Sequence, residues 1–215
     1  MAFDLEEQEK IDRLKAWWEQ WGNIISGLIL AVLLAILGWY GWNWYQANQT
    51  RNALGYFEIV ENNHRATEDD ALYRLQEANQ ILQDKYQGNI YAGRGALLSA
   101  RAYLERQDYA QAEAELQRIL NNSKRYPELV GAATLQLATV YIDQAKFEPA
   151  MALLNQEMTG YEALFADKRG DVYYAQGDVS NATSQWSQAA EASNASGEFV
   201  QTMQFKLSLL GEVNE

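Results

Sequence analysis

The sequence has no cysteine, a single histidine, two prolines and far fewer basic than acidic residues. Without cysteine the chain can form no disulfide, no thiolate zinc site and no iron–sulfur cluster. A single histidine also excludes a metal site built from several imidazoles. The formal net charge of −12 argues against nucleic acid as a partner, because too few basic side chains are left to neutralise phosphates.

Motifs of catalysis and cofactor binding are lacking as well. The sequence contains no H-E-x-x-H, no G-x-x-x-x-G-K and no C-x-x-C. Gly93-Arg94-Gly95 lacks the third glycine of a dinucleotide-binding turn, and His64 stands in a polar run that indicates a loop. We interpret Asp167, Asp171 and Asp178 as solvated or helix-capping acids. We therefore expect no enzyme, no cofactor and no small-molecule substrate.

Tryptophan is unevenly distributed, with six of the seven residues inside 28 positions. Between them, residues 24–42 read IISGLILAVLLAILGWYGW and carry no charge. As a helix, 19 residues span about 28 Å, close to the hydrocarbon thickness of a bilayer. Indole rings favour the membrane–water interface. The sequence therefore predicts a transmembrane helix over residues 22–45, with Trp17, Trp18 and Trp21 at one interface and Trp39, Trp42 and Trp44 at the other.

Neither of two other readings explains this segment as well. A cleaved signal peptide would end in small residues, whereas residues 38–42 are bulky. A buried helix of a soluble protein would not need aromatic residues at both ends.

The charges beside the segment predict its orientation. Lys10, Arg13 and Lys15 precede it, and only Arg51 follows within 15 residues. Positive charge is retained on the cytoplasmic side, so residues 1–21 form a cytoplasmic tail and residues 46–215 lie on the far side of the membrane. The tail is amphipathic, and it either lies on the membrane surface or extends the transmembrane helix.

Four small residues, Gly27, Ala31, Ala35 and Gly38, share one face of the predicted membrane helix. Such a face lets a second helix approach closely. Small residues are also common in membrane helices, so the pattern alone does not identify a partner.

An internal repeat predicts the fold of the rest of the chain. Its units run Ala100-x-x-Tyr103 with Asp108-Tyr109-x-x-Ala112-x-x-x-Leu116, then Ala138-x-x-Tyr141 with Lys146-Phe147-x-x-Ala150-x-x-x-Leu154, then Gly170-x-x-Tyr173 with Asp178-Val179-x-x-Ala182-x-x-x-Trp186. The spacing resembles that of tetratricopeptide repeats, in which small residues let paired helices approach. We predict an all-α protein: one transmembrane helix, then a helical solenoid of three to four hairpins.

The ends of the solenoid deviate from the repeat. Residues 53–63 and 69–86 are predicted to form a degenerate first hairpin, with Leu72, Leu75, Ile81 and Leu82 inward. Residues 198–209 are predicted to form a capping helix, whose apolar side we assign to Phe199, Met203, Phe205 and Leu209.

Anchor, tail and repeats together resemble the YfgM family of Gram-negative bacteria. The resemblance includes DRLKAWW at residues 12–18, GWYGWN at residues 38–43 and ADKRGD at residues 166–171. It implies an inner-membrane protein with a periplasmic domain. It also implies three partners: the SecYEG translocon, the membrane-anchored periplasmic chaperone PpiD, and emerging client polypeptides.

By the usual repeat register, the first helix of each pair lines a concave binding face. The residues predicted there are Arg94, Leu97, Arg101, Leu104, Glu105, Leu135, Thr139, Ile142, Asp143, Asp167, Asp171 and Tyr174. Apolar and charged side chains alternate on this face, which suits an extended segment or a partner loop. Two alternatives remain: an adaptor for a signalling protein, and an enzyme, which would require a deep pocket with converging polar groups.

Overall fold

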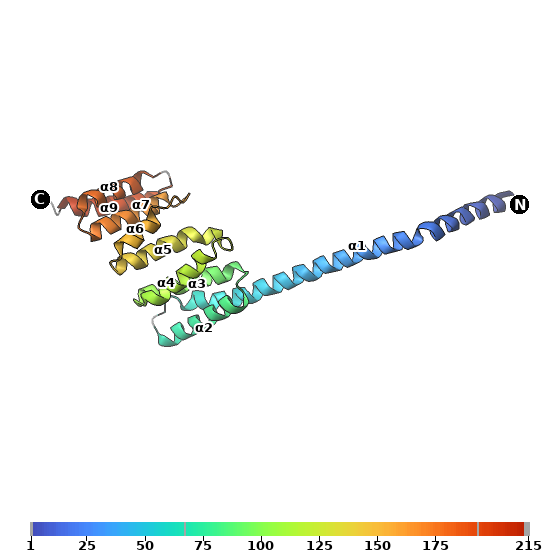
Figure 1. Cartoon of the computed structure of the whole chain (residues 1–215), viewed down its shortest axis with the longest axis horizontal. Helices are drawn as coiled ribbons and strands as arrows, with labels where there is room; N and C mark the ends of the chain where they lie inside the picture. Colours follow the sequence, from blue (N-terminus) through green and yellow to red (C-terminus); the bar gives the residue numbers. More distant parts are fainter. Residues whose placement is uncertain (1, 67, 193, 213–215) are drawn as a thin grey trace. The chain divides into compact units, whose positions relative to one another are not determined.

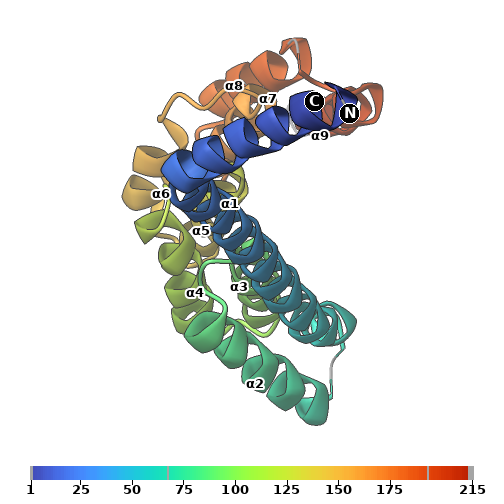
Figure 2. The same ribbon diagram turned by 90° about the vertical axis from the view of Figure 1, so that its right-hand side faces the viewer.

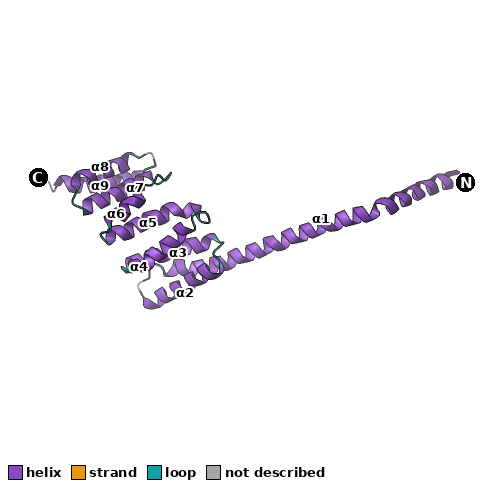
Figure 3. Cartoon of the chain, in the orientation of Figure 1, coloured by secondary structure: helices purple, strands orange, loops and turns teal. Residues whose placement is uncertain are grey.

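The computed structural model describes residues 2–66, 68–192 and 194–212, and all regular structure in these ranges is helical (Figures 1 and 3). The elements are α1 (Ala2–Asn63), α2 (Asp69–Lys85), α3 (Ile90–Glu105), α4 (Tyr109–Asn121), a 3₁₀ turn (Pro127–Leu129), α5 (Val130–Asp143), α6 (Phe147–Leu154), α7 (Glu162–Ala175), α8 (Val179–Glu191) and α9 (Gly197–Glu212). The predicted all-α fold is confirmed. The chain divides into two compact units, residues 1–51 and 52–215.

The first unit is the greater part of α1, one helix that continues without a break from the tail through the apolar run. It contains a segment long and apolar enough to cross a membrane. Its large side chains lie open, with Leu28, Leu34 and Leu37 each at least 60% exposed. So much uncovered apolar surface is stable only in an apolar surrounding such as lipid. In this structure the tail extends the membrane helix.

The second unit is a stack of helical hairpins. Residues 52–63 of α1 pack against α2 through Phe57, Val60, Leu75 and Leu82, which confirms the predicted degenerate hairpin. The pairs α3–α4, α5–α6 and α7–α8 follow, and α9 closes the stack. Figure 2 shows α2, α4, α6 and α8 on the outer side of this stack, with α3, α5 and α7 on the inner side.

The same turn joins the two helices of each repeat. Gln107, Ala145 and Gly177 stand at equivalent positions, and all three have a left-handed backbone, with φ of 59°, 56° and 81°. The following residue then donates its N–H to the carbonyl of the repeat tyrosine, as from Asp108 to Tyr103 at 2.9 Å. These bonds satisfy helix-end carbonyls that would otherwise lack a donor. The turn thus sets the angle between paired helices.

Small residues sit where the paired helices touch, as the repeat predicts. Ala100, Ala138, Ala112, Ala150 and Ala182 are at most 1% exposed, and Leu116, Leu154 and Trp186 fill the adjoining space. Gly170 has no room for a side chain, because an added Cβ would lie 2.4 Å from Trp186 Cδ1. In the third helix pair, the large Trp186 therefore packs against Gly170, which has no side chain.

One prediction for the capping helix is wrong. Met203 is buried as expected, and Phe199 packs partly against the same core, but Phe205 is 63% and Leu209 46% exposed. Leu210 and Leu207 take the inward positions instead. A stripe through 199, 203, 207 and 210 follows the 3.6-residue period, whereas 205 and 209 fall outside it.

Candidate protein-interaction site

The twelve residues predicted on the inner side of the stack lie on α3, α5 and α7, and we call them the first-helix surface. Its exposed members are Arg94, Arg101, Glu105, Asp143 and Tyr174. Its half-buried members are Leu97, Leu104, Leu135, Thr139, Ile142 and Asp171, and Asp167 is buried. The structure thus brings most of these side chains to solvent, on successive helices.

On α3, the charged residues of the first-helix surface interact with their own helix. Arg101 Nε lies 3.1 Å from Glu105 Oε1, in an ion pair that is nearly half exposed at each end. The Arg94 guanidinium lies 6.0 Å from the centre of the Tyr91 ring. Exposed i,i+4 pairs contribute only about 0.3–0.5 kcal/mol. Both arginines can therefore exchange these contacts for a partner's carboxylate or carbonyl at little cost.

On α5, the surface is mostly aliphatic. Leu135 and Ile142 are half-buried, and Thr139 donates its hydroxyl to the Leu135 carbonyl at 3.1 Å. That bond satisfies the hydroxyl within the helix, so Thr139 presents its methyl group at low cost. Asp143 is exposed at the end of the helix. This middle section offers apolar contact beside one negative charge.

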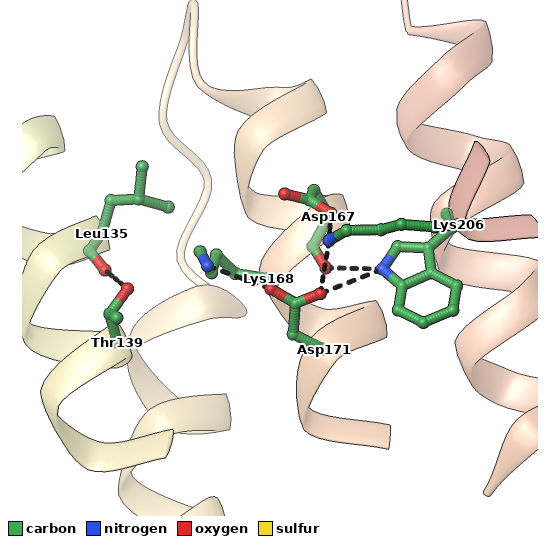
Figure 4. Close-up of polar contacts among 7 residues, drawn as sticks. Leu135, Thr139, Asp167, Lys168, Asp171 and Lys206 are labelled. Atoms are coloured by element: carbon green, nitrogen blue, oxygen red, sulfur yellow. Dashed lines mark hydrogen bonds and ion pairs between the residues drawn. The ribbon is translucent and has the colours of Figure 1, made fainter. Parts of the chain in front are cut away.

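On α7, the two acids are held inside the chain rather than left open. Lys206 Nζ of α9 lies 2.6 Å from Asp167 Oδ1 and 2.6 Å from Asp171 Oδ1, and Lys168 bonds the other Asp171 oxygen at 3.0 Å (Figure 4). The indole N–H of Trp186 reaches the Asp167 carbonyl and Asp171 Oδ1, both at 3.2 Å. The interpretation of Asp167 and Asp171 as solvated or capping acids is wrong, because the capping helix supplies a half-buried cation, Lys206, that pairs with both.

This cluster raises the pKa of both Asp167 and Lys206, for different reasons. Burial raises the pKa of Asp167, and the hydrogen bond from Lys206 only partly offsets this while Asp171 adds to it. Burial alone would lower the pKa of Lys206, but bonds to two carboxylates outweigh it and raise that pKa. Lys206 is charged beside two carboxylates, which favours its protonated form, whereas the buried Asp167 has the Asp171 charge beside it, which disfavours ionisation. The cluster fastens α9 to α7.

Asp178 does act as a helix cap, as predicted. It accepts a hydrogen bond from the Asn181 backbone N–H at 3.1 Å at the start of α8. The backbone and side-chain hydrogen bonds from Asn181 lower the pKa of Asp178. Asp108 likewise caps α4, where it accepts a hydrogen bond from the Gln111 backbone N–H at 3.3 Å. His64 directly follows α1, with Nδ1 2.6 Å from the Glu61 carbonyl. These polar groups serve local structure.

The tryptophans predicted at the membrane interfaces and the small residues of α1 form a second candidate contact region. Trp17, Trp18, Trp21, Trp39, Trp42 and Trp44 are all between 45% and 67% exposed. An added Cβ at Gly27 or Gly38 would meet nothing within 4 Å, so the small face is open. Lipid or another membrane helix can approach it directly.

The sequence patterns missed two groups on the second unit, Lys206 and Glu115. Glu115 stands three residues after the small position Ala112, where the other repeats carry Leu153 and Gln185, both half-buried. A charged residue at that repeat position was the available signal. Among the described residues no three His, Asp or Glu lie close enough to hold a metal ion.

Comparison with known proteins places the whole chain in one family. Residues 15–212 match the model of a tetratricopeptide repeat-like domain. An ancillary SecYEG translocon subunit of Neisseria gonorrhoeae is 30% identical over 98% of this chain and 100% of its own length. Proteins of the same description from Haemophilus influenzae and Escherichia coli are 29% and 26% identical, over 89% and 95% of this chain and 92% and 96% of theirs.

No solved structure matches the chain. The family match covers the predicted anchor as well as the repeats, because it begins within the tail and ends in the last helix. The chain therefore belongs to the YfgM family of ancillary SecYEG translocon subunits, whose members carry a tetratricopeptide repeat-like domain.

Proposed function

We propose that this chain is an ancillary, non-enzymatic subunit of the SecYEG translocon in the inner membrane. Residues 22–45 anchor it, residues 1–21 lie in the cytoplasm, and residues 46–215 lie in the periplasm. There the repeat domain links the translocon to a PpiD-like chaperone and to emerging client polypeptides. The observation that carries this proposal is the match to relatives described as translocon subunits over nearly the whole chain, anchor included.

The anchor supports a contact inside the membrane. Gly27, Ala31, Ala35 and Gly38 lie within an arc of about 80° on a helix that turns 100° per residue. No side chain of this helix covers Gly27 or Gly38. Because lipid is as apolar as leucine, close backbone approach is what favours helix association in a bilayer. This face is suited to a translocon or chaperone membrane helix.

The first-helix surface supports contact with polypeptides. Arg94 and Arg101 can bind backbone carbonyls or carboxylates, and Leu135 and Ile142 offer apolar contact between them and Tyr174, which is 54% exposed. Asp167 and Asp171 contribute indirectly, by holding α9 beside α7. The mixture suits segments of varied sequence.

Photocrosslinking from the membrane helix tests the translocon contact. A photoreactive residue at Gly27 or Ala31 is expected to capture a SecYEG or PpiD-like helix in intact membranes. The matched controls are Leu33 and Ile36, which point to the opposite side of α1 and are expected to capture lipid. If Gly27 and Ala31 also capture lipid only, the proposed membrane contact is wrong.

Two further measurements test the topology and the polypeptide contact. A periplasm-active reporter fused after residue 215 is expected to be active, whereas activity only at the N-terminus would favour the signalling-adaptor alternative. Asp143→Lys with Tyr174→Ala is expected to reduce co-purification of the PpiD-like chaperone. Glu148→Lys, an exposed charge reversal on α6, is the control and is expected to leave it unchanged.

A further inference from the structure

The second helices α2 and α4 do not close against each other, and a cavity of about 390 Å³ lies between them. Gln76, Asn79, Gln80, Gln83 and Asp84 line it from α2, Gln111, Glu115 and Arg118 line it from α4, and Tyr103 lines it from α3. Both α2 and α4 lie on the outer side of the stack (Figure 2), and the cavity shares no residue with the first-helix surface. Its lining is almost wholly polar.

One side chain in this cavity is under-satisfied. Glu115 is only 7% exposed, and its Oε2 is buried and accepts no hydrogen bond. Arg118 Nε lies 3.5 Å away, close enough to attract the carboxylate but not bonded to it. Burial raises the pKa of Glu115, and the Arg118 charge and an Asn79 hydrogen bond do not compensate. A buried carboxylate oxygen without a donor is costly, so the site favours any group that supplies one.

The neighbouring amides show which kind of group is missing. Gln83 Nε2 is already committed to Asn79 Oδ1 at 3.2 Å and to the Ala92 carbonyl at 2.8 Å. Glu115 and Asp84 together outweigh Arg118, so the lining carries a net charge of −1. A positively charged donor is therefore favoured over a neutral one, and an anion is disfavoured.

The cavity is large enough to admit the end of a long amino-acid side chain. Its volume is near the lower end of the range of ligand-binding pockets, which is about 300–1,000 Å³. An ammonium group is compact and carries three donors, whereas a guanidinium is a broad fork that would compete with the one on Arg118. The chemistry that fits best is the end of a lysine side chain.

We propose that the cavity between α2 and α4 binds a lysine side chain of a polypeptide partner, with its ammonium group forming an ion pair with the Glu115 carboxylate at the cavity wall. The exposed side-chain amides of Gln80 and Gln111 flank the opening and can bond the backbone of the same segment. This gives the repeat domain a second, lysine-selective contact on its outer side. It does not depend on the translocon assignment.

The test uses the full chain in nanodiscs of zwitterionic lipid. The probe is an acetylated and amidated Gly-Ser-Lys-Ser-Gly peptide, and its analogue with norleucine in place of lysine keeps the aliphatic chain but lacks the ammonium group. Binding is followed by the backbone NMR signals of α4. A charge-assisted hydrogen bond accounts for about ten- to hundredfold in affinity, so the norleucine peptide is expected to bind at least tenfold more weakly.

The variant Glu115→Gln keeps the shape of the side chain and removes its charge, and it is expected to cause the same loss for the lysine peptide. The matched control is Glu77→Gln, an exposed glutamate of α2 outside the cavity, which is expected to leave binding within about twofold.

Any one of four results would overturn the proposal. The first three are equal binding of the lysine and norleucine peptides, unchanged binding of the lysine peptide to the Glu115→Gln variant, and no binding at millimolar peptide. Ammonium chloride that shifts the same signals to the same extent would indicate a site for small cations and would also overturn it. The peptide comparison needs only the wild-type chain, so it holds even if a variant fails to fold.

Discussion

Substitution of Gly170 by alanine separates local helix preference from tertiary packing. Gly170 lies in the middle of α7, where alanine is favoured over glycine by about 1 kcal/mol. Its added Cβ, however, would lie 2.4 Å from both Cδ1 and Nε1 of Trp186. Real Cβ atoms essentially never come that close to another heavy atom. The Trp186 ring must therefore move.

The ring has little freedom to move. It is 4% exposed, its N–H bonds the Asp167 carbonyl and Asp171 Oδ1, and the Lys206 ammonium lies 5.1 Å from its centre. Overpacking a core costs about 1–3 kcal/mol, and the displaced N–H loses about 1 kcal/mol more. After the helix-propensity gain is subtracted, we expect Gly170→Ala to destabilise the domain by about 2 kcal/mol.

Thermal unfolding of the full chain in detergent micelles, followed by circular dichroism, measures this change. For a unit of this size the expected loss corresponds to a fall in Tm of about 4–8 °C. The matched control is Gly55→Ala, because Gly55 is also helical but an added Cβ there meets nothing within 4 Å. That control is expected to raise Tm by about 2–4 °C.

A second variant tests the named contact. Trp186→Phe removes Nε1, one of the two closest clashing atoms, so in its background Gly170→Ala is expected to cost at least about 1 kcal/mol less than in the wild type. If Gly170→Ala stabilised the domain as Gly55→Ala does, or showed no coupling to residue 186, the packing argument would be refuted.

Three other predictions follow from the same structure. Ala145→Gly relieves a left-handed backbone with φ of 56° and is expected to raise the free energy of unfolding in urea by about 0.5–1 kcal/mol. Gly177→Ala introduces a side chain at the equivalent left-handed position and is expected to lower it. Burial raises the pKa of Glu115, so the folded state gains stability from this group below its ordinary value of 4.5 and loses it as the pH rises through the raised pKa. The Glu115→Gln variant should therefore have a higher Tm than the wild type at pH 7 and lose that advantage near pH 4. A lower Tm of the variant at pH 7 would contradict this reasoning, because it would mean that the Glu115 charge stabilises the fold. Lys206→Met leaves Asp167 and Asp171 without their shared cation and is expected to cost about 2–3 kcal/mol. Because the pKa of Asp167 is raised, that cost should shrink in acid melts as Asp167 takes up a proton.

The repeat could be predicted because each of its positions has a local physical role. Ala100, Ala112 and their equivalents are small because two helices meet there, and the 38- and 32-residue spacings recur in both sets. The left-handed turn was less visible, because only Gly177 among the three equivalent residues marks it by type. Gln107 and Ala145 adopt the same backbone because the surrounding helix pair requires it.

The candidate sites were less predictable because their partners come from distant parts of the chain. Asp167 and Asp171 were identified as acids, but the cation that they bind is 39 and 35 residues away. Nothing near them in the sequence indicates Lys206. For Glu115 the sequence shows only a charged residue at that repeat position, and its burial depends on the neighbouring α2.

The sequence by itself determined the membrane-spanning helix, the all-helical class and the order of the hairpins. These follow from the length of an apolar run, from helical periodicity and from the recurrence of small residues, all of which act over a few turns of one helix. Only the tertiary structure decided which side of α9 faces inward, which acids are paired, and which carboxylate is left under-satisfied between α2 and α4. The reason is that burial and pairing depend on the segment that packs opposite, and the stacking of successive hairpins brings that segment into place.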